Sequence, residues 1–167
     1  MKFDNVKFGY LQLSDMKLRT VFATLLGVMA AGIFCVLDTV AAQTADTPRS
    51  QWDGVYTATQ ATRGGSLYLQ YCAMCHGPDL MGGEMAPPLI GGTFQSNWNE
   101  LSLGDLFERI RTSMPQNSPG GLSRQQYADI LSYMLSKDGY PAGQIELPPQ
   151  TETLKETKFL SMKPSAQ

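Results

Sequence analysis

Hydrophobic residues recur at helical spacing in three stretches of this chain, and each recurrence predicts an amphipathic helix. The first stretch is 62–71, which ends directly before a pair of cysteines. The second opens at Ser102, a favourable N-cap, and repeats apolar residues at positions i, i+3, i+4 and i+7. Those apolar residues are Leu103, Leu106, Phe107 and Ile110. The third opens at Ser123, which forms a capping-box pattern with Gln126, and ends near Gly139.

The segments between these helices are irregular. Residues 77–92 contain five glycines and three prolines, and 112–121 is a loop that contains two prolines. No stretch alternates between polar and apolar residues strictly enough to predict a strand. The pattern therefore predicts a small all-α fold, with about three main helices joined by long loops.

The N-terminus has a different pattern. Residues 21–37 are almost uninterruptedly apolar, follow Lys17 and Arg19, and precede small residues that end at Ala42. This order is typical of a secretory signal peptide that is cleaved after Ala42. An uncleaved membrane anchor is the alternative, since 17 residues reach the lower limit of a membrane span. We therefore expect export to the periplasm, or a membrane-anchored protein that faces it.

These patterns divide the chain into four parts. We expect a signal peptide over 1–42, a flexible lead-in over 43–60, a helical domain over 61–138 and an extended C-terminal tail over 139–167. Residues 43–167 contain nine Lys and Arg and twelve Asp and Glu, which gives a net charge of −3. They contain no cluster of basic residues. Nucleic acid and anionic membrane surfaces are therefore poor candidates for a partner.

Candidate chemistry is concentrated at the end of the first helix. Cys72, Cys75 and His76 form the pattern Cys-x-x-Cys-His, the attachment signature of a c-type haem. Two thiols three residues apart can each bond one porphyrin vinyl group, and the next imidazole can ligate the iron. A thioredoxin-type disulfide and half of a zinc site are the alternatives, but neither a βαβ pattern nor enough further Cys and His residues accompany the motif. One covalently bound haem c is therefore expected.

The opposite face of the iron needs a second ligand. His76 is the only histidine, so methionine is the next candidate, and its thioether favours Fe(II). Met114 lies in the loop between the second and third helices, precedes Pro115 and follows His76 by 38 residues, a distance that allows it to reach the far face. The alternatives are that Met85 is the ligand or that Met114 is an ordinary surface residue.

From about residue 61 to residue 137 the chain resembles the class I c-type cytochromes, which carry one haem near the N-terminus and a methionine ligand before the last helix. The pattern also matches Gly64, Tyr68, the segment Pro87-Pro88-Leu89, Ile130 and Tyr133. The resemblance implies a small cytochrome c fold in which Gly64 and Tyr68 cross the last helix at close range.

The resemblance also implies roles for two further residues. The carbonyl of Pro87 would accept a hydrogen bond from Nδ1 of His76 and so fix the ligand's orientation, with Pro88 as the near alternative. The indole N–H of Trp98 would donate to a haem propionate, and a simple core role for Trp98 is the alternative.

More narrowly, residues 103–134 and the tail segment 140–148 are similar to small haem proteins associated with PQQ-dependent dehydrogenases. We therefore expect a non-enzymatic carrier that passes single electrons from a dehydrogenase donor to an oxidase or another cytochrome. The alternatives are a haem subunit of a PQQ-type dehydrogenase or oxidase complex, and an open-site haem peroxidase or gas sensor.

Overall fold

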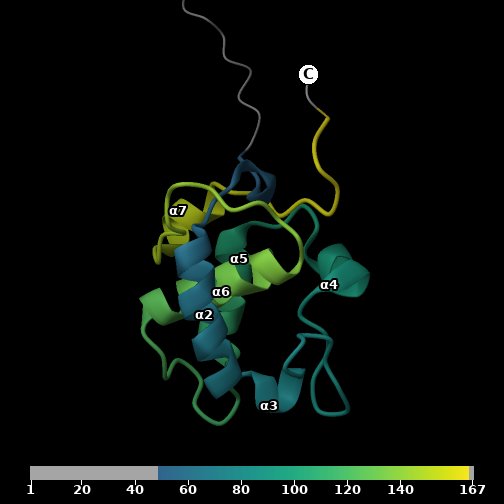
Figure 1. Ribbon diagram of the computed structural model, residues 1–167, viewed down its shortest axis with the longest axis vertical. Helices are drawn as coiled ribbons and strands as arrows, with labels where there is room; N and C mark the ends of the chain where they lie inside the picture. Colours follow the sequence, from purple (N-terminus) through teal and green to yellow (C-terminus); the bar gives the residue numbers. More distant parts are fainter. Residues whose placement is uncertain (1–48, 166–167) are drawn as a thin grey trace, which may run out of the picture. The chain divides into compact units, whose positions relative to one another are not determined.

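Three long helices frame the structure, a computed structural model that describes residues 49–165 (Figure 1). They are α2 (Ala58–Tyr71), α5 (Leu103–Ser113) and α6 (Arg124–Lys137). These helices coincide with the three predicted amphipathic stretches and confirm the all-α fold. Between residues 49 and 165 the only β-type pairing consists of two isolated bridges. The predicted signal peptide lies outside the described residues.

The helix ends are fixed by the side chains that the sequence pattern indicates. Ser102 and Ser123 each cap the following helix, and both form complete capping boxes, with Asp105 and Gln126 respectively. Thr57 accepts a hydrogen bond from the backbone of Gln60 and so begins α2 earlier than predicted.

Four shorter helices complete the described residues: η1 (Gln51–Asp53), α3 (Ala73–His76), α4 (Gly91–Trp98) and α7 (Thr151–Lys155). No helix in this part of the chain is long and apolar enough to span a bilayer. The sequence pattern missed α4, because it opens with two glycines inside a stretch that is rich in glycine and proline. A distant residue supplies its cap: Oδ1 of Asp138, beyond the end of α6, accepts a hydrogen bond from the backbone N–H of Gly91 at 2.7 Å.

Helices α2 and α6 cross at a glycine. A Cβ atom at Gly64 would lie 1.8 Å from the carbonyl oxygen of Asp129, so only a residue without a side chain permits this approach. One turn further along α2, the ring of Tyr68 packs against that of Tyr133 with centroids 5.4 Å apart. The close crossing implied by the resemblance is thus confirmed.

The C-terminal tail is not extended along its length, in contrast to the expectation for 139–167. Leu147, Leu154 and Phe159 are each 1 % exposed or less, so apolar burial fixes the tail against the helices. Helix α7 lies so close to α5 that a Cβ atom at Gly104 would be 2.8 Å from the carbonyl oxygen of Thr151.

The end of the tail lies between two earlier segments. Gln51 donates its backbone N–H to the carbonyl of Lys158 (3.2 Å), and Phe159 donates to the carbonyl of Leu101 (2.7 Å). The side-chain amide of Gln51 also donates to the carbonyl of Leu160 at 2.6 Å. The residues just before α2, which were expected to form a flexible lead-in, are therefore part of the packed domain.

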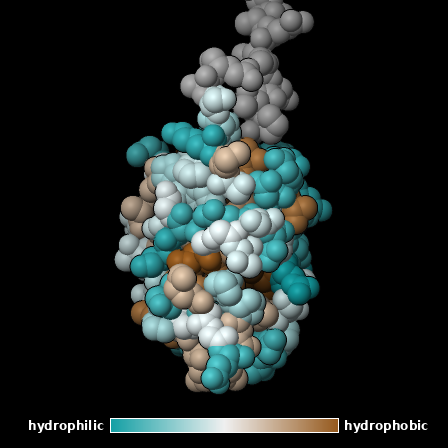
Figure 2. All heavy atoms as spheres, turned by 90° about the vertical axis from the view of Figure 1, so that its right-hand side faces the viewer, coloured by the Kyte–Doolittle hydropathy of each residue, from teal (hydrophilic) through white to brown (hydrophobic). Residues whose placement is uncertain are grey.

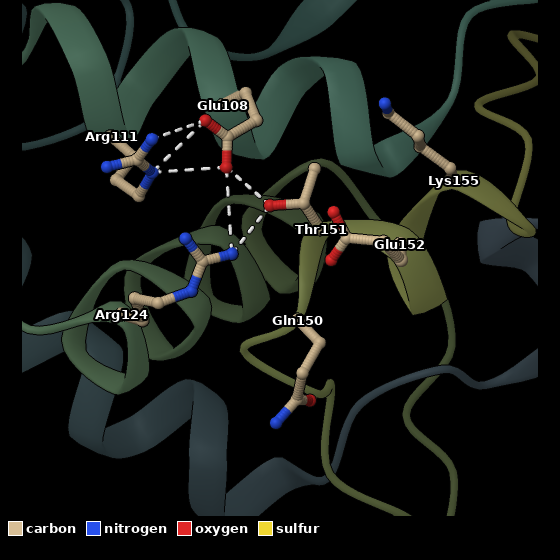
Figure 3. A pocket seen from close by; sticks show the side chains of 7 residues that line it. All are labelled: Glu108, Arg111, Arg124, Gln150, Thr151, Glu152 and Lys155. Atoms are coloured by element: carbon tan, nitrogen blue, oxygen red, sulfur yellow. Dashed lines mark hydrogen bonds and ion pairs between the residues drawn. The ribbon is translucent and has the colours of Figure 1, made fainter.

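A polar cluster joins α7 to α5 and α6 (Figure 3). Glu108 accepts hydrogen bonds from Arg111 and from the hydroxyl of Thr151. Arg124 donates to the same hydroxyl at 2.6 Å and lies over the ring of Phe107, 5.1 Å from its centroid. The bonds from Arg111 and Thr151 lower the pKa of Glu108 from 4.5 to about 2.

The lowered pKa of Glu108 predicts that the folded protein loses stability at acidic pH. Because the pKa of Glu108 is lower in the folded state, its contribution to stability is complete above about 4.5 and is lost as the pH falls towards 2. Glu108→Gln should flatten the fall in the free energy of unfolding across this window, as measured by urea titrations at stepwise lower pH. The control is Glu152→Gln, which removes a carboxylate from the same cavity but none of these contacts. Equal slopes for the two variants would contradict the prediction.

Candidate functional site

The attachment motif lies at the junction of α2 and α3. Cys72 ends α2 by donating its backbone N–H to the carbonyl of Tyr68 at 2.8 Å, and its own carbonyl accepts from the N–H groups of Cys75 (3.2 Å) and His76 (3.0 Å). The structure therefore holds Cys72, Cys75 and His76 on one short turn, and both thiols are free.

The two thiols differ in environment. Cys72 is partly buried, whereas Cys75 is exposed. Burial raises the pKa of the Cys72 thiol to about 11, with a smaller contribution from the neighbouring Cys75. At neutral pH the Cys72 thiol is therefore protonated.

His76 is buried, and its orientation is fixed by Pro87. The Nδ1 atom lies 2.9 Å from the carbonyl oxygen of Pro87. A carbonyl can only accept, so Nδ1 carries the proton and Nε2 keeps the lone pair that can ligate a metal. This is the contact that the resemblance implies, and it is made by Pro87 rather than Pro88.

The loop after α3 positions this carbonyl. The backbone N–H of Gly82 donates to the carbonyl of His76 (2.9 Å), and Leu89 donates to Leu80 (2.8 Å). Gly82 has a φ of +75°, and a Cβ atom there would lie 2.6 Å from the backbone nitrogen of Pro88. The loop therefore needs a glycine at this position to keep Pro87 against His76.

Gly82→Ala is expected to break the bond between Pro87 and His76, because the added methyl group collides with the backbone that carries the carbonyl. Exchange of the Nδ1 proton of His76 should become about tenfold faster, consistent with the loss of one hydrogen bond. Proton NMR of the reduced protein measures this rate. Gly83→Ala is the matched control, since a Cβ atom there meets nothing within 4 Å. Unchanged exchange in Gly82→Ala would show that the loop does not position Pro87.

Met114 is the C-terminal cap of α5. Its backbone is extended (φ −125°, ψ 152°), its N–H donates to the carbonyl of Ile110 at 2.9 Å, and its carbonyl accepts from the hydroxyl of Tyr127 at 2.7 Å. The side chain is half-buried. The loop that follows Met114 and helix α3 both lie in the lower half of Figure 1. No hydrogen bond within residues 49–165 joins Met114 to His76.

Trp98 is the last residue of α4 and is half-buried. Its ring lies 6.3 Å from that of Phe94, centroid to centroid. The indole of Trp52 donates to the carbonyl of Leu160, but among the described residues the indole of Trp98 has no such hydrogen bond. Both a core role and donation to a bound group remain consistent with this position.

Half-buried hydrophobic side chains that pack on the core come from α3, α4, α5 and the loops that follow α3 and α5. They are Ala73, Leu89, Ile90, Trp98, Ile110 and Leu122. Figure 2 shows strongly hydrophobic atoms at mid-height of one face, framed by polar ones. Two thiols, one imidazole with a free Nε2 atom and these partly exposed apolar side chains fit a porphyrin, whose ring is large and apolar and whose iron accepts nitrogen ligands.

Sequence reasoning missed several residues that shape the site. The hydroxyl of Tyr68 donates to the carbonyl of Gly77 at 2.6 Å, and that of Tyr127 holds Met114. Gly82 was seen only as part of a glycine-rich loop. No local pattern signals these roles, because each depends on a backbone atom brought near by the fold.

Comparison with known proteins gives one match. Residues 59–134 match the family model described as cytochrome C oxidase, cbb3-type, subunit III. The matched span contains Cys72, Cys75, His76, Pro87 and Met114. No curated protein and no solved structure matches the chain.

Proposed function

We propose, from the premise that residues 59–134 form a class I c-type cytochrome domain, that this protein is a monohaem carrier of single electrons in the periplasm. The domain binds haem c through Cys72 and Cys75 and serves haem-based electron transfer. The observation that carries the proposal is the hydrogen bond between Nδ1 of His76 and the carbonyl of Pro87, which leaves Nε2 free for iron.

The residues of this chain have three roles in the proposal. When bound, haem c supplies a reversible one-electron Fe(III)/Fe(II) couple. Pro87 orients His76 and increases its basicity as a ligand. The half-buried hydrophobic side chains exclude water from the ring, and Cys72 and Cys75 keep the group attached through repeated oxidation and reduction.

Met114 is proposed as the second axial ligand. Support comes from its place at the end of α5. There its backbone N–H donates to Ile110 and its carbonyl accepts from the hydroxyl of Tyr127, and these two hydrogen bonds fix its position. A thioether ligand raises the reduction potential and occupies the site at which oxygen, CO or peroxide would bind. Trp98 is proposed to donate to a haem propionate.

The proposed location rests on the signal-peptide pattern of 1–42, since c-type haem is attached after export. An anchored form is the alternative if this segment is retained. We propose a dehydrogenase as donor and an oxidase or another cytochrome as acceptor.

A second candidate is a haem subunit of a larger respiratory complex. The name of the matched family, an oxidase subunit, favours an oxidase complex. The similarity of the tail to haem proteins associated with PQQ-dependent dehydrogenases favours a dehydrogenase complex instead. Size-exclusion chromatography of the native periplasmic and membrane fractions separates a free carrier from a subunit.

The carrier function is tested with the purified, haem-loaded protein. A reversible one-electron titration, together with slow CO binding by the reduced form, is expected for an iron with two protein ligands. Rapid CO binding, or turnover of peroxide, would instead indicate an open iron site and would overturn the carrier proposal.

A further inference from the structure

Exposed methionines lie within the attachment motif and in the loop that follows it. Met74 on α3 is 93 % exposed, and Met81 and Met85 in the following loop are 59 % and 76 % exposed. We call these three residues the methionine surface. Because the N–H of Gly82 donates to the carbonyl of His76 at 2.9 Å, the loop with Met81 and Met85 lies against the end of α3.

Two residues of the methionine surface, Met81 and Met85, line a hollow. Residues 81–88 line a surface hollow of about 510 Å³, which includes Pro87, the residue that orients His76. Exposed apolar side chains that gather at one place commonly mark an interaction site. Methionine suits such a site, because its unbranched side chain adapts to the shape of a partner.

The segment that carries the methionine surface has charged residues of one sign only. Asp79 and Glu84 are the only Asp, Glu, Lys or Arg residues in 64–99, and both are exposed. A carboxylate within about 10 Å of a docking face attracts cations at moderate salt and repels anions.

The segment around Met114 adds little charge. Residues 112–123 contain no Asp, Glu, Lys or Arg. The flanking residues Arg111 and Arg124 are both paired with Glu108, at 2.6 and 3.6 Å, and exposed Arg109 precedes them. The loop after Met114 is therefore uncharged, and Asp79 and Glu84 are the only acidic residues of the two loops next to the haem-binding residues.

We propose that the methionine surface docks a redox protein whose contact face is apolar and edged by Lys or Arg. This inference rests on the proposed carrier function and names the chemistry of its partner. The methionines are buried in the complex. Asp79 and Glu84 attract the Lys or Arg side chains of the partner and so fix the orientation in which it docks. One electron passes from the reduced protein to the oxidised partner, and no covalent bond or proton is exchanged.

The test uses a small probe with the same chemistry as the proposed partner. Tris(1,10-phenanthroline)cobalt(III) is a cation with apolar ligands, and the cobalt gains the one electron that the reduced protein loses. The second-order rate constant should fall as salt is added, and Glu84→Lys should lower it about threefold at low ionic strength. The double variant Met81→Ser with Met85→Ser should lower it about threefold at high ionic strength, where charge is screened.

Matched controls lie in the tail. Glu152→Lys makes the same change in net charge on α7, at the opposite end of Figure 1 from α3, and Met162→Ser removes a methionine that is 80 % exposed. Both should react at nearly the original rate. The inference is overturned if Glu152→Lys slows the reaction as much as Glu84→Lys, or if the methionine double variant behaves like Met162→Ser.

A failure of the carrier proposal would give a different result from a failure of the docking inference. In that case the reduced protein would transfer no electrons either to the cobalt complex or to hexacyanoferrate(III), an anionic oxidant. Ready reaction with both, but without dependence on the methionine surface, would remove only the docking inference.

Discussion

Met114→Ala is expected to abolish the weak far-red charge-transfer band of the oxidised protein and to lower its reduction potential by on the order of 100 mV or more. The band reports a methionine sulfur on ferric haem, and loss of the thioether removes the ligand that favours Fe(II). The carbonyl of residue 114, which accepts from Tyr127, is a backbone group and remains available in the variant. The change therefore removes the proposed ligand while keeping the contact between Tyr127 and the backbone of residue 114.

Optical spectroscopy and a redox titration of the purified protein measure both effects. Met85→Ala is the matched control, because Met85 is exposed in the loop near Pro87 and is the alternative ligand. An intact band in Met114→Ala together with a lost band in Met85→Ala would assign the ligand to Met85. The reduced form of Met114→Ala should also bind CO rapidly, since one iron position is then open.

Gly64→Ala should produce the largest loss of stability. Its methyl group would lie 1.8 Å from the carbonyl oxygen of Asp129, and a backbone atom in α6 cannot move aside as a side-chain end can. The two helices must separate, which disturbs the packing of Tyr68 against Tyr133. We expect the free energy of unfolding to fall by about 3 kcal/mol, measured by guanidinium titration of the haem-loaded protein.

Gly65→Ala supplies the comparison. A Cβ atom there would lie 3.1 Å from the ring of Tyr133, and that ring can shift. Both substitutions gain about 1 kcal/mol of helix propensity, so the difference between them reports how much worse a backbone collision is than a contact with a movable ring. Similar losses in the two variants would contradict the idea that α2 and α6 meet at Gly64.

The sequence was sufficient for the parts of the fold that depend on local patterns. Ser102 and Ser123 marked the starts of α5 and α6, because capping residues and helical periodicity lie within a few residues of each other. Helix α4 was missed, since its cap, Asp138, is 47 positions away. The tail was missed for a related reason: Leu147, Leu154 and Phe159 show no helical or strand period, and only the folded surface gives them a place to pack.

The candidate site also contains features that depend on local sequence and features that depend on distant contacts. The motif Cys72 to His76 is local, so its chemistry follows from spacing alone. The hydrogen bond between Pro87 and His76 was expected from a resemblance, and the geometry of the loop supplies its physical basis in Gly82. The hydroxyl bonds of Tyr68 and Tyr127 could not be foreseen, because they end on carbonyls that only the fold brings near.

The position of residues 157–161 between two earlier segments has a consequence for how this domain forms. The stretch that matches the family, 59–134, ends before the tail begins, yet Phe159 is fully buried and Gln51 holds Leu160. The stretch that matches the family is thus shorter than the packed domain. The contacts between Gln51 and residues 158–160 can therefore form only after the chain has been made at least to residue 160, later than any contact within 59–134.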